Sequence, residues 1–501
     1  MAKKVTFNIS KKDNFSEWYS EILAKAEVTD LRYGVKGFVV IRPWGTRIID
    51  KMYKIYESAL RCTGHEPAIF PAVIPEGNFL KESSHVEGFA PDVFWLDKDC
   101  TSGDDRLALR PTSETAFYDL YGLWIRSYRD LPMKMYQRCN VFRNETKATR
   151  PLIRSREFHW IESHDAFATK KDAEAQVQDD IRMTDEIMHK IFGVPFLPMR
   201  RPEWDKFPGA EYTVGSDSIL PDGKVIQQPS THLISQHFVK AFDLKFATRA
   251  SQVPSSRAKE KTKVPWLTCY GPCMSRMLAS VISMHGDDSG LVLPYTLAPY
   301  QVVIIPIVKE VIGNRQQVMG AVEDIRAQLL LEYIDVKIDD SDKRPGEKFY
   351  YWEMKGVPFR IEIGEKELEN DEVSLFIRDI REKISVSIRD LPETIKNLGA
   401  EYDERLLARA DEDFEGRVVD CSSKEEIKRG LEDGKICRFD FCSCEKEGAG
   451  CAEFVEKELS ARVMGTLASA SEVVDGRGQK VGKCVVCGKK AIAKVYAGKS
   501  Y

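Results

Sequence analysis

Apolar residues recur along the first part of the chain with the spacings of helices and strands. Within 13–34 they recur every three or four positions, which predicts an amphipathic helix. Its apolar face comprises Phe15, Trp18, Tyr19, Ile22 and Leu23. A second helix is expected from about Thr46 to Cys62, before an extended segment that contains Pro71 and Pro75. Because proline lacks the donor of the strand ladder, Pro71 predicts an edge, a bulge or a subunit contact.

Residues 134–164 show the pattern of two strands around an irregular middle. KMYQRCNVF (134–142) and EFHWIESH (157–164) alternate apolar and polar positions. The residues between them have no apolar period and include a proline. The pattern therefore predicts a long hairpin.

Helices and strands are also predicted on both sides of this hairpin. Upstream, a tight turn at Arg110 leads into a helix that Thr112 or Ser113 is expected to cap. Downstream, an amphipathic helix over 170–193 precedes an antiparallel meander, which is expected to lead into a helix near His232. These elements predict a mixed sheet-and-helix unit.

The pattern changes twice more toward the end of the chain. A glycine turn at Gly271 precedes an apolar helix that begins near Arg276. Strands then alternate with helices, which is typical of an α/β domain, and a helical linker leads to a cysteine-rich end. A chain of 501 residues has room for two to four domains, and the overall class is α+β. The predicted domains are 1–296, 297–395 and 396–501.

Composition narrows the possible partners and locations. The formal net charge is −4 and the isoelectric point is about 6.2, so any nucleic acid must be bound by local patches rather than by overall charge. No apolar run approaches the roughly 20 residues of a membrane helix. The first residues also lack the apolar core of a secretory signal, so we expect a cytoplasmic protein without a membrane partner.

Local charge within the predicted hairpin is reversed relative to the acidic chain. Between 134 and 157 there are seven basic residues and two acids, Glu145 and Glu157. Arginine offers planar, bidentate hydrogen bonds to phosphate, so the excess indicates an anion site. A solvated charged loop is the alternative. The basic residues are Lys134, Arg138, Arg143, Lys147, Arg150, Arg154 and Arg156.

Cysteines are concentrated at the end of the chain. Seven of the twelve lie in the last 81 residues, which in a reducing cytoplasm indicates a metal site rather than disulfides. Cys484 and Cys487 have the spacing of a zinc knuckle. The upstream pair stays open at this point, because four cysteines compete for it: Cys437, Cys442, Cys444 and Cys451.

Three features in one order resemble the signature motifs of the class II aminoacyl-tRNA synthetases. They are the strand with Pro71, the hairpin segment Phe142-Arg143-x-Glu145, and the glycine turn before Arg276. Three further segments are similar to prolyl-tRNA synthetases of the archaeal and eukaryal type. These are Arg110-Pro-Thr-Ser-Glu114, Arg154-Ser-Arg-Glu-Phe158 and Trp160-x-Glu-x-His164.

This resemblance implies a fold and an activity. The fold would be an antiparallel-sheet catalytic domain, an α/β anticodon-binding domain and a small α/β zinc-binding C-terminal domain. The chain would be a homodimeric ligase that makes prolyl-adenylate from L-proline and ATP and transfers proline to the 3′ end of tRNA(Pro). About a hundred residues separate the second and third motifs, which leaves no room for the editing domain of most bacterial relatives.

The resemblance also implies which residues bind ATP. Arg143 and Arg276 would be catalytic because negative charge builds on the phosphates during attack. Ser230 stands where the family more usually has threonine. Mg²⁺ would bridge the phosphates and be held largely by the nucleotide and water. The implied ATP-binding residues are Arg143, Glu145, Arg154, Ser155, Gln227, Ser230 and Arg276.

A second set of residues would bind proline. For His164 and His232, a structural role is the alternative. A ring-sized apolar pocket separates small side chains by only about 1–3 kcal/mol, so we expect misactivation of cysteine or alanine. The implied proline-binding residues are Thr112, Glu114, Arg143, Phe158, Trp160, Glu162, His164 and His232.

The later domains carry the remaining expectations. Glu353 and Arg360, near the aromatic run 349–352, would contact the tRNA anticodon, although that run also fits half-buried strand and loop positions. The resemblance selects Cys442 and Cys451 to complete a structural Zn²⁺ site with Cys484 and Cys487. Tyr501 resembles a C-terminal tyrosine of the family that folds back toward the active site.

Two rival functions are weighed against this one. The first is a class II enzyme of another specificity, such as threonyl, against which the missing threonyl-type zinc ligands argue. The second is a non-enzymatic tRNA-binding paralogue, which would be free to lose Arg143, Glu145 and Arg276.

Overall fold

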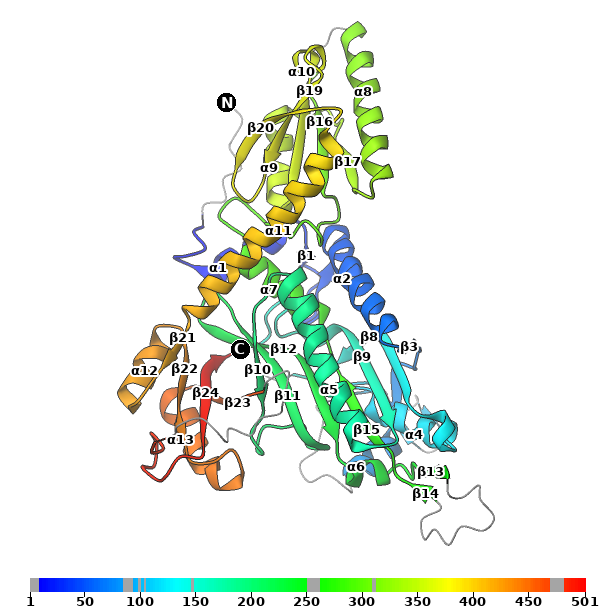
Figure 1. Cartoon of the computed structure of the whole chain (residues 1–501), viewed down its shortest axis with the longest axis vertical. Coiled ribbons are helices and arrows are strands. Elements are labelled where there is room, and N and C mark those ends of the chain that lie inside the picture. The colour runs from blue at the N-terminus through cyan, green and yellow to red at the C-terminus, as the bar shows by residue number, and fades with distance from the viewer. Residues whose placement is uncertain are drawn as a thin grey trace.

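The structure is a computed structural model with three regions (Figure 1). A large sheet with its covering helices forms the centre, and a smaller α/β unit extends from it. The long helix α11 (Leu391–Glu415) runs from that unit toward the C-terminal strands. The described residues are 9–83, 93–97, 101–102, 105–145, 148–249, 262–308, 312–468 and 482–501.

The central sheet has eleven strands and is mostly antiparallel. Only the pairs β3–β8, β12–β24 and β21–β22 are parallel among the pairings of this sheet in the described residues. In spatial order its strands are β21 (Val418–Asp420), β22 (Ile436–Phe441), β24 (Ala493–Ser500), β23 (Arg462–Leu467), β10 (Leu197–Arg200), β11 (Ala210–Ile219), β12 (Lys224–Ile234), β15 (Trp266–Tyr270), β9 (Glu157–Phe167), β8 (Met133–Phe142) and β3 (Glu66–Pro67).

The predicted hairpin is confirmed as the pair β8 and β9. Their register runs without interruption from Phe142 opposite Glu157 to Met133 opposite Ala166. The basic loop between the strands is described except at 146–147, so Lys147 lies outside the described residues. Alternating apolar and polar positions favour a strand, although β9 is buried on both faces from Ile161 to Phe167 because it lies inside the sheet.

Helices cover this sheet, with two departures from the predicted bounds. The second helix begins at Pro43 rather than Thr46, because proline suits a first helical turn. The helix expected near His232 begins only at Gln236, so His232 lies within β12. The helices are α1 (Phe15–Lys25), α2 (Pro43–Cys62), α3 (Glu76–Ser83), α4 (Glu114–Trp124), α5 (Lys170–Thr184), the π-helix η2 (Asp185–Ile191), α6 (Gln236–Lys240) and α7 (Met274–His285).

The predicted face of α1 is confirmed as part of the main core. All five apolar residues named for this helix are buried, against α2 and α7 among others. Short pairs of strands flank the sheet outside its main path. They are β1 (Thr29–Asp30) with β2 (Val40–Ile41), β4 (Val73–Pro75), β5 (Phe94–Trp95) and β6 (Thr101–Ser102) with β7 (Asp105–Leu109), and β13 (Phe246–Ala247) with β14 (Thr262–Lys263).

The smaller unit is a five-stranded sheet with helices, as the pattern of alternating elements predicted. The aromatic run 349–352 lies on helix α9, which corrects the expectation of strand and loop positions. Its elements are β16 (Val302–Pro306), α8 (Ile312–Leu331), β17 (Val336–Ile338), α9 (Pro345–Lys355), β18 (Phe359–Ile363), α10 (Glu365–Glu369), β19 (Glu372–Ile377) and β20 (Glu382–Ser387).

The C-terminal region extends the central sheet. Strand β23 pairs with β10 at Met199 and Leu467, so the last strands of the chain and the strands of the central region share one sheet. The remaining elements here are α12 (Lys424–Glu432) and α13 (Ala449–Leu459), with the 3₁₀ turn at 446–448. The predicted boundary between 395 and 396 lies within α11, which is continuous through both regions.

An ion pair between a buried arginine and a partly exposed aspartate joins the α/β unit to the central region. Arg378, which is 1% exposed, donates from both Nη atoms to Asp287, at 2.8 and 2.7 Å. Asp287 directly follows the Gly286 cap of α7. Burial opposes ionisation of Asp287, and the Arg378 guanidinium and backbone amides outweigh it, so the pKa of Asp287 is lowered. The contact therefore couples the position of the α/β unit to helix α7.

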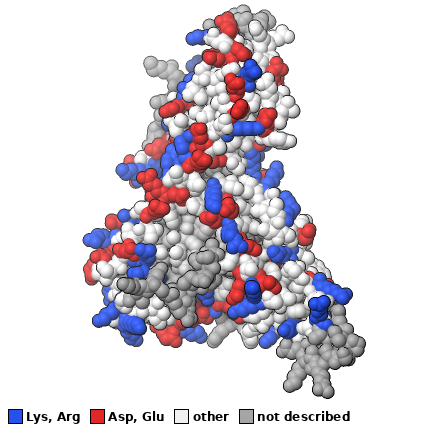
Figure 2. All heavy atoms as spheres, viewed as in Figure 1, with Lys and Arg blue, Asp and Glu red and all other residues white. Residues whose placement is uncertain are grey.

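Acidic and basic side chains are interspersed over the face drawn in Figure 2. No single sign of charge dominates that face, in keeping with the net charge of −4. Among the described helices, none combines the length and the hydropathy that a membrane crossing requires.

Candidate active site

One cavity of about 440 Å³ opens on the face of the central sheet. Its walls come from the start of α4, strands β9, β12 and β15, the loop 201–208, and the start of α7. Ten of the fourteen residues predicted to bind ATP or proline line it. They are Thr112, Glu114, Arg143, Glu145, Trp160, Glu162, Gln227, Ser230, His232 and Arg276.

Buried carboxylates form one end of the cavity. Glu162 is 1% exposed, and its Oε1 accepts hydrogen bonds from the Thr112 hydroxyl at 2.9 Å and from the Ser113 amide at 3.2 Å. The Thr112 hydroxyl also contacts Glu114. Ser113 occupies the N-cap of α4 without a side-chain cap bond and instead accepts from Gln137. Ser113 thus occupies the expected N-cap position, but the expected side-chain cap bond is not made, because the Thr112 hydroxyl bonds the carboxylates and the Ser113 hydroxyl bonds Gln137.

Cys269 lies against the same carboxylates. Its Sγ donates to Glu114 Oε1 at 3.4 Å. Burial and the neighbouring charges of Glu114 and Glu162 raise the pKa of the Cys269 thiol well above its usual value. The thiol therefore remains protonated while nothing else binds there.

Two guanidinium groups form the opposite end. Arg143 donates from Nε to the Pro111 carbonyl at 3.3 Å and lies 5.3 Å from the centre of the Trp160 ring. Arg276 donates from Nη1 to the Gln227 carbonyl at 3.0 Å. Both lie over the Phe158 ring, at 5.8 and 5.4 Å. Arg276 also donates from Nε to the Ile153 carbonyl at 3.2 Å, and both arginines line the cavity.

Positive charge is concentrated at this end to a degree that affects ionisation. Burial lowers the pKa of Arg276, and the nearby charges of Arg143 and Arg154 lower it further. An arginine remains protonated even so. The arrangement is unfavourable without a counter-ion, so it favours an anionic ligand such as a phosphate.

Four of the predicted residues do not line the cavity: Arg154, Ser155, Phe158 and His164. Arg154 donates to Glu145 at 3.0 Å and to the Tyr501 carbonyl at 3.1 Å. Ser155 is buried, and Phe158 supports the two arginines from below. Tyr501 thus reaches the hairpin loop, and its hydroxyl donates to Asp222 at 2.7 Å.

His232 is a neutral, fully bonded imidazole. Its Nδ1 lies 2.8 Å from the Thr213 hydroxyl, and its Nε2 lies 3.1 Å from the Ser230 hydroxyl. Burial lowers its pKa to about 3, helped by the charge of Arg201. The Ser230 hydroxyl, expected to contact ATP, is therefore in hydrogen-bond contact with a residue expected to contact proline.

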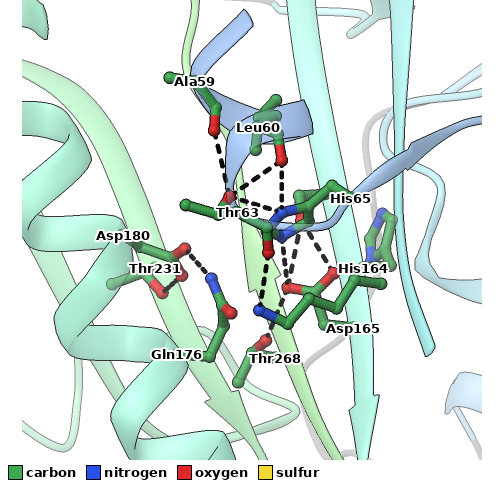
Figure 3. Close-up of polar contacts among 12 residues, drawn as sticks. Ala59, Leu60, Thr63, His65, His164, Asp165, Gln176, Asp180, Thr231 and Thr268 are labelled. Atoms are coloured by element: carbon green, nitrogen blue, oxygen red, sulfur yellow. Dashed lines mark hydrogen bonds and ion pairs between the residues drawn. The ribbon is translucent and has the colours of Figure 1, made fainter. Parts of the chain in front are cut away.

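His164 and Asp165 are neighbours on β9 and point to opposite faces of the sheet. Asp165 joins a buried network with His65 at 3.3 Å and Thr268 at 3.3 Å, whereas the His164 ring lies outside this network (Figure 3). His164 packs on the Phe117 ring at a centroid distance of 4.4 Å. Successive residues of a strand point to opposite faces of the sheet, which explains why Asp165 joins this network and His164 does not.

The loop 201–208 was missed by the sequence analysis. Arg201 is 5% exposed and pairs with both oxygens of Asp217, which holds the loop over the sheet. A Cβ at Gly215 would lie 2.3 Å from this guanidinium, so a glycine is needed there. No apolar period marks the loop, because a buried ion pair positions it. The cavity-lining residues missed are Pro111, Arg201, Asp205, Lys206, Phe207, Pro208, Thr213, Gln228, Cys269, Gly271 and Cys273.

Four cysteine sulfurs meet in the C-terminal region. The Sγ atoms of Cys442, Cys451, Cys484 and Cys487 all lie within 4.8 Å of one another, with Cys442 and Cys451 3.6 Å apart. Four thiolates bound tetrahedrally at 2.3 Å would lie about 3.8 Å apart, so the group fits zinc. A hydrogen bond from the Lys489 amide contributes most to lowering the pKa of Cys487, to about 7. Cys437 and Cys444 lie outside this group.

The two residues expected to contact the anticodon are mostly buried. Arg360 on β18 lies 4.2 Å from the centres of both the Phe349 and Phe376 rings and pairs with Glu362 at 3.0 Å. Glu353 on α9 pairs with Arg381 at 2.8 Å. Each has 8% of its surface exposed.

Two family models match the chain. Residues 94–285 match the tRNA synthetase class II core domain (G, H, P, S and T), and residues 301–398 match an anticodon binding domain. The fold and the cavity thus define a class II aminoacyl-tRNA synthetase, and the predicted fold class is confirmed.

Curated and solved relatives narrow this class. A proline–tRNA ligase of Thermofilum pendens is 45% identical over 98% of both chains, and one of Methanococcoides burtonii is 41% identical with the same coverage. A Giardia lamblia prolyl-tRNA synthetase in complex with prolyl-adenylate matches with a TM-score of 0.90 and 38% identity, over 99% of this chain and 100% of that one. The chain belongs to the proline–tRNA ligase family.

Proposed function

We propose that the cavity makes prolyl-adenylate from L-proline and ATP and then transfers the prolyl group to the 3′ end of tRNA(Pro). The observation that carries this proposal is the pair Arg143 and Arg276, which share the Phe158 ring opposite the buried carboxylates. The cavity therefore has a positive end for phosphates and an acidic end for an ammonium group. The presence of both arginines also argues against the alternative of a non-enzymatic tRNA-binding paralogue, which would be free to lose them.

Activation joins the two ends. A carboxylate oxygen of proline attacks the α-phosphorus, the bond to the β,γ-phosphates breaks, and pyrophosphate leaves. Arg143 would neutralise the α-phosphate and Arg276 the γ-phosphate. Because both guanidinium groups are already held in position, they would stabilise the negative charge that develops during the attack and so lower the barrier. In the second step the 3′-terminal hydroxyl of the tRNA attacks the prolyl carbonyl and AMP leaves.

The adenine and phosphate contacts use the hairpin loop. Glu145 would accept a hydrogen bond from the adenine amino group. Arg154 donates to Glu145 and would hold that carboxylate in orientation. Arg154 and Ser155 would also lie near the outer phosphates. Gln227 and Ser230 line the same wall from β12. Mg²⁺ would arrive with the nucleotide and stay bound mainly to phosphate and water, since Glu114 and Glu162 are occupied at the other end.

The proline contacts use the acidic end. Glu114 and the Thr112 hydroxyl would accept hydrogen bonds from the secondary ammonium, and Glu162 would hold Thr112 in position. Trp160 supplies an apolar wall beside Arg143, and Phe158 lies beneath it. His232, bonded through both nitrogens and neutral, would orient Ser230 and close the wall; His164 lies below the floor.

We further propose that the enzyme misactivates alanine or cysteine and has no editing domain of its own. Between β9 and β15 the described residues form α5, η2, β10–β12 and α6, which belong to the central sheet or its cover, and the two-residue strands β13 and β14, which pair with each other. ATP–pyrophosphate exchange with each amino acid tests both specificity and class. Proline is expected to be preferred by about 10–200-fold. A preference above ten-thousandfold over both competitors would contradict the proposal, and threonine-dependent exchange would favour another specificity.

We propose that Cys442, Cys451, Cys484 and Cys487 bind one structural Zn²⁺. Four thiolates close the coordination shell, so the ion would stabilise the C-terminal strands and take no part in the reaction. Cys451→Ser is expected to lose zinc and lower the thermal unfolding midpoint, because metal binding contributes directly to folding. The matched control Cys444→Ser should retain one zinc per chain by elemental analysis. Equal zinc content in both variants would argue against this ligand set.

We propose that the α/β unit binds the tRNA anticodon through the region of Glu353 and Arg360. Their burial suggests that they hold the aromatic side chains of α9 and β19 in place for stacking on bases. Glu353→Ala or Arg360→Ala should raise the KM for tRNA by about tenfold, which equals about 1.4 kcal/mol. Proline-dependent pyrophosphate exchange is the internal control. Loss of exchange together with aminoacylation would instead indicate misfolding.

We also propose a homodimer in the cytoplasm. Ile69 is 96% exposed beside Pro71, and the neighbouring helix α4 exposes Leu123 and Trp124, which together form an apolar surface suited to a second subunit. The unpaired thiols of the described cysteines fit a reducing compartment. Sedimentation of the intact chain measures the oligomeric state.

A further inference from the structure

A second group of metal-binding atoms lies at the acidic end of the cavity. Glu114, His164 and Cys269 each bring one oxygen, nitrogen or sulfur atom within 4.8 Å of the other two. All three side chains are buried. They come from the start of α4 and from two neighbouring strands, so the rigid scaffold rather than a loop brings them together.

The strand register accounts for two of these positions. His164 on β9 is directly opposite Cys269 on β15. Opposite residues of an antiparallel pair project to the same face with Cβ atoms about 4.5–5.5 Å apart. Glu114 then completes the group, with its Oε1 3.4 Å from Cys269 Sγ. That separation already matches the spacing of an oxygen and a sulfur around one tetrahedral zinc ion.

His164 supplies an independent indication of a ligand. Its side chain is 0% exposed, and neither Nδ1 nor Nε2 has a hydrogen-bond partner among the described residues. A buried donor or acceptor without a partner costs about 1–3 kcal/mol. By contrast, His232, which lines the cavity, is bonded through both nitrogens. The contrast shows that the fold satisfies one imidazole and leaves the other available.

We propose that Glu114, His164 and Cys269 form a site for Zn²⁺ or a similar divalent transition metal at the floor of the amino-acid end. Imidazole, thiolate and carboxylate are all ligands that zinc accepts, and binding would release the thiol proton of Cys269. Three protein ligands leave the fourth position open. Glu114 and Cys269 line the cavity, so that position faces the space where the substrate enters.

Metal and proline would exclude each other, a consequence that rests on the proposed function. Glu114 cannot coordinate an ion and also accept from the ammonium of proline, and two cations at that point would repel each other. The site would therefore make activation sensitive to free zinc: metal raises the apparent KM for proline and leaves kcat unchanged.

Cobalt binding tests the site without relying on catalysis. The full chain, with one zinc per chain already bound at the four-cysteine group, is titrated with Co²⁺. One additional equivalent is expected to give thiolate-to-cobalt charge-transfer absorbance, and saturating L-proline is expected to remove it. Elemental analysis checks that the first zinc is retained. Absence of a second thiolate-bound equivalent, or a signal that proline does not displace, would overturn the proposal.

Variants assign the signal to these residues. Cys269→Ser is expected to abolish the charge-transfer band, whereas Cys273→Ser, which alters another buried thiol of the same cavity, should keep it. His164→Gln should retain the band and weaken cobalt binding by more than about tenfold, since even loss of a ligand's outer partner costs that much. A band that survives Cys269→Ser would contradict the assignment. Proline-dependent exchange by the wild type, run with Mg²⁺ and without added Co²⁺ or free Zn²⁺, reports the proposed function separately.

Discussion

Arg143→Ala is expected to lower kcat for proline-dependent ATP–pyrophosphate exchange by on the order of a hundred- to thousandfold. The guanidinium lies over Phe158 and Trp160, anchored to the Pro111 carbonyl, so it is held where the α-phosphate would pass through its most negative state. Removing one fixed donor from such a site costs about 3–4 kcal/mol in the transition state. The loss should appear mainly in kcat, because the charge it stabilises develops during attack.

Arg138→Ala is the matched control for this experiment. Arg138 lies on β8, which ends one residue before Arg143, but it pairs with Asp50 at the surface and stacks on Tyr53 outside the cavity. Its removal should change exchange by less than about threefold, because exposed ion pairs contribute at most about 1 kcal/mol. Unfolding midpoints of both variants verify the fold. Equal activity of the two variants would show that Arg143 does not act on the phosphate.

Asp287→Ala is expected to lower the free energy of unfolding by about 3 kcal/mol. The substitution leaves the Arg378 guanidinium, 1% exposed, without its carboxylate, and breaking a buried pair by removing one partner costs about 3–5 kcal/mol. We expect a cost at the lower end of this range because the Asp287 side chain is 40% exposed. Aminoacylation should fall more than pyrophosphate exchange, since the pair joins the α/β unit to α7.

Two further variants isolate the ion pair from other effects. Asp288→Ala removes the adjacent acid, whose partner is the exposed backbone amide of Lys11, and should change stability by less than about 0.5 kcal/mol. The double variant Asp287→Ala with Arg378→Met should recover part of the loss, because it removes the unpaired charge and keeps an apolar side chain of similar length. A double variant less stable than Asp287→Ala would refute this account. Denaturant unfolding measures all three.

The hairpin could be predicted because its signals are local. Alternation over β8 and β9 specifies strands, and the basic excess between them indicates an anion, so the positions of Arg143 and Glu145 follow from short segments alone. The same holds for α1 and for the glycine turn before α7. Arg276 lies in the first turn of α7. In each case neighbours in sequence determine the structure.

Other features depend on contacts between distant segments. The loop 201–208 reaches the cavity through the Arg201–Asp217 pair, and Thr112 bonds a carboxylate on β9 instead of capping α4. The aromatic run 349–352 has no clear period of its own, and packing against the five-stranded sheet decides that it is helical. Propensity and pattern say little about such choices, because tertiary burial outweighs them.

The sequence by itself determined the order of the elements, the basic hairpin, the two arginines and the cysteine-rich end, since periodicity, charge and residue spacing are properties of short segments. Only the tertiary structure decided which four cysteine sulfurs meet, how the last strands extend the catalytic sheet, and that His164 lies beside Cys269 with no hydrogen-bond partner in the described part of the chain. Those outcomes depend on the register of strands far apart in the chain. Register is set by the summed burial of whole faces, which no local pattern contains.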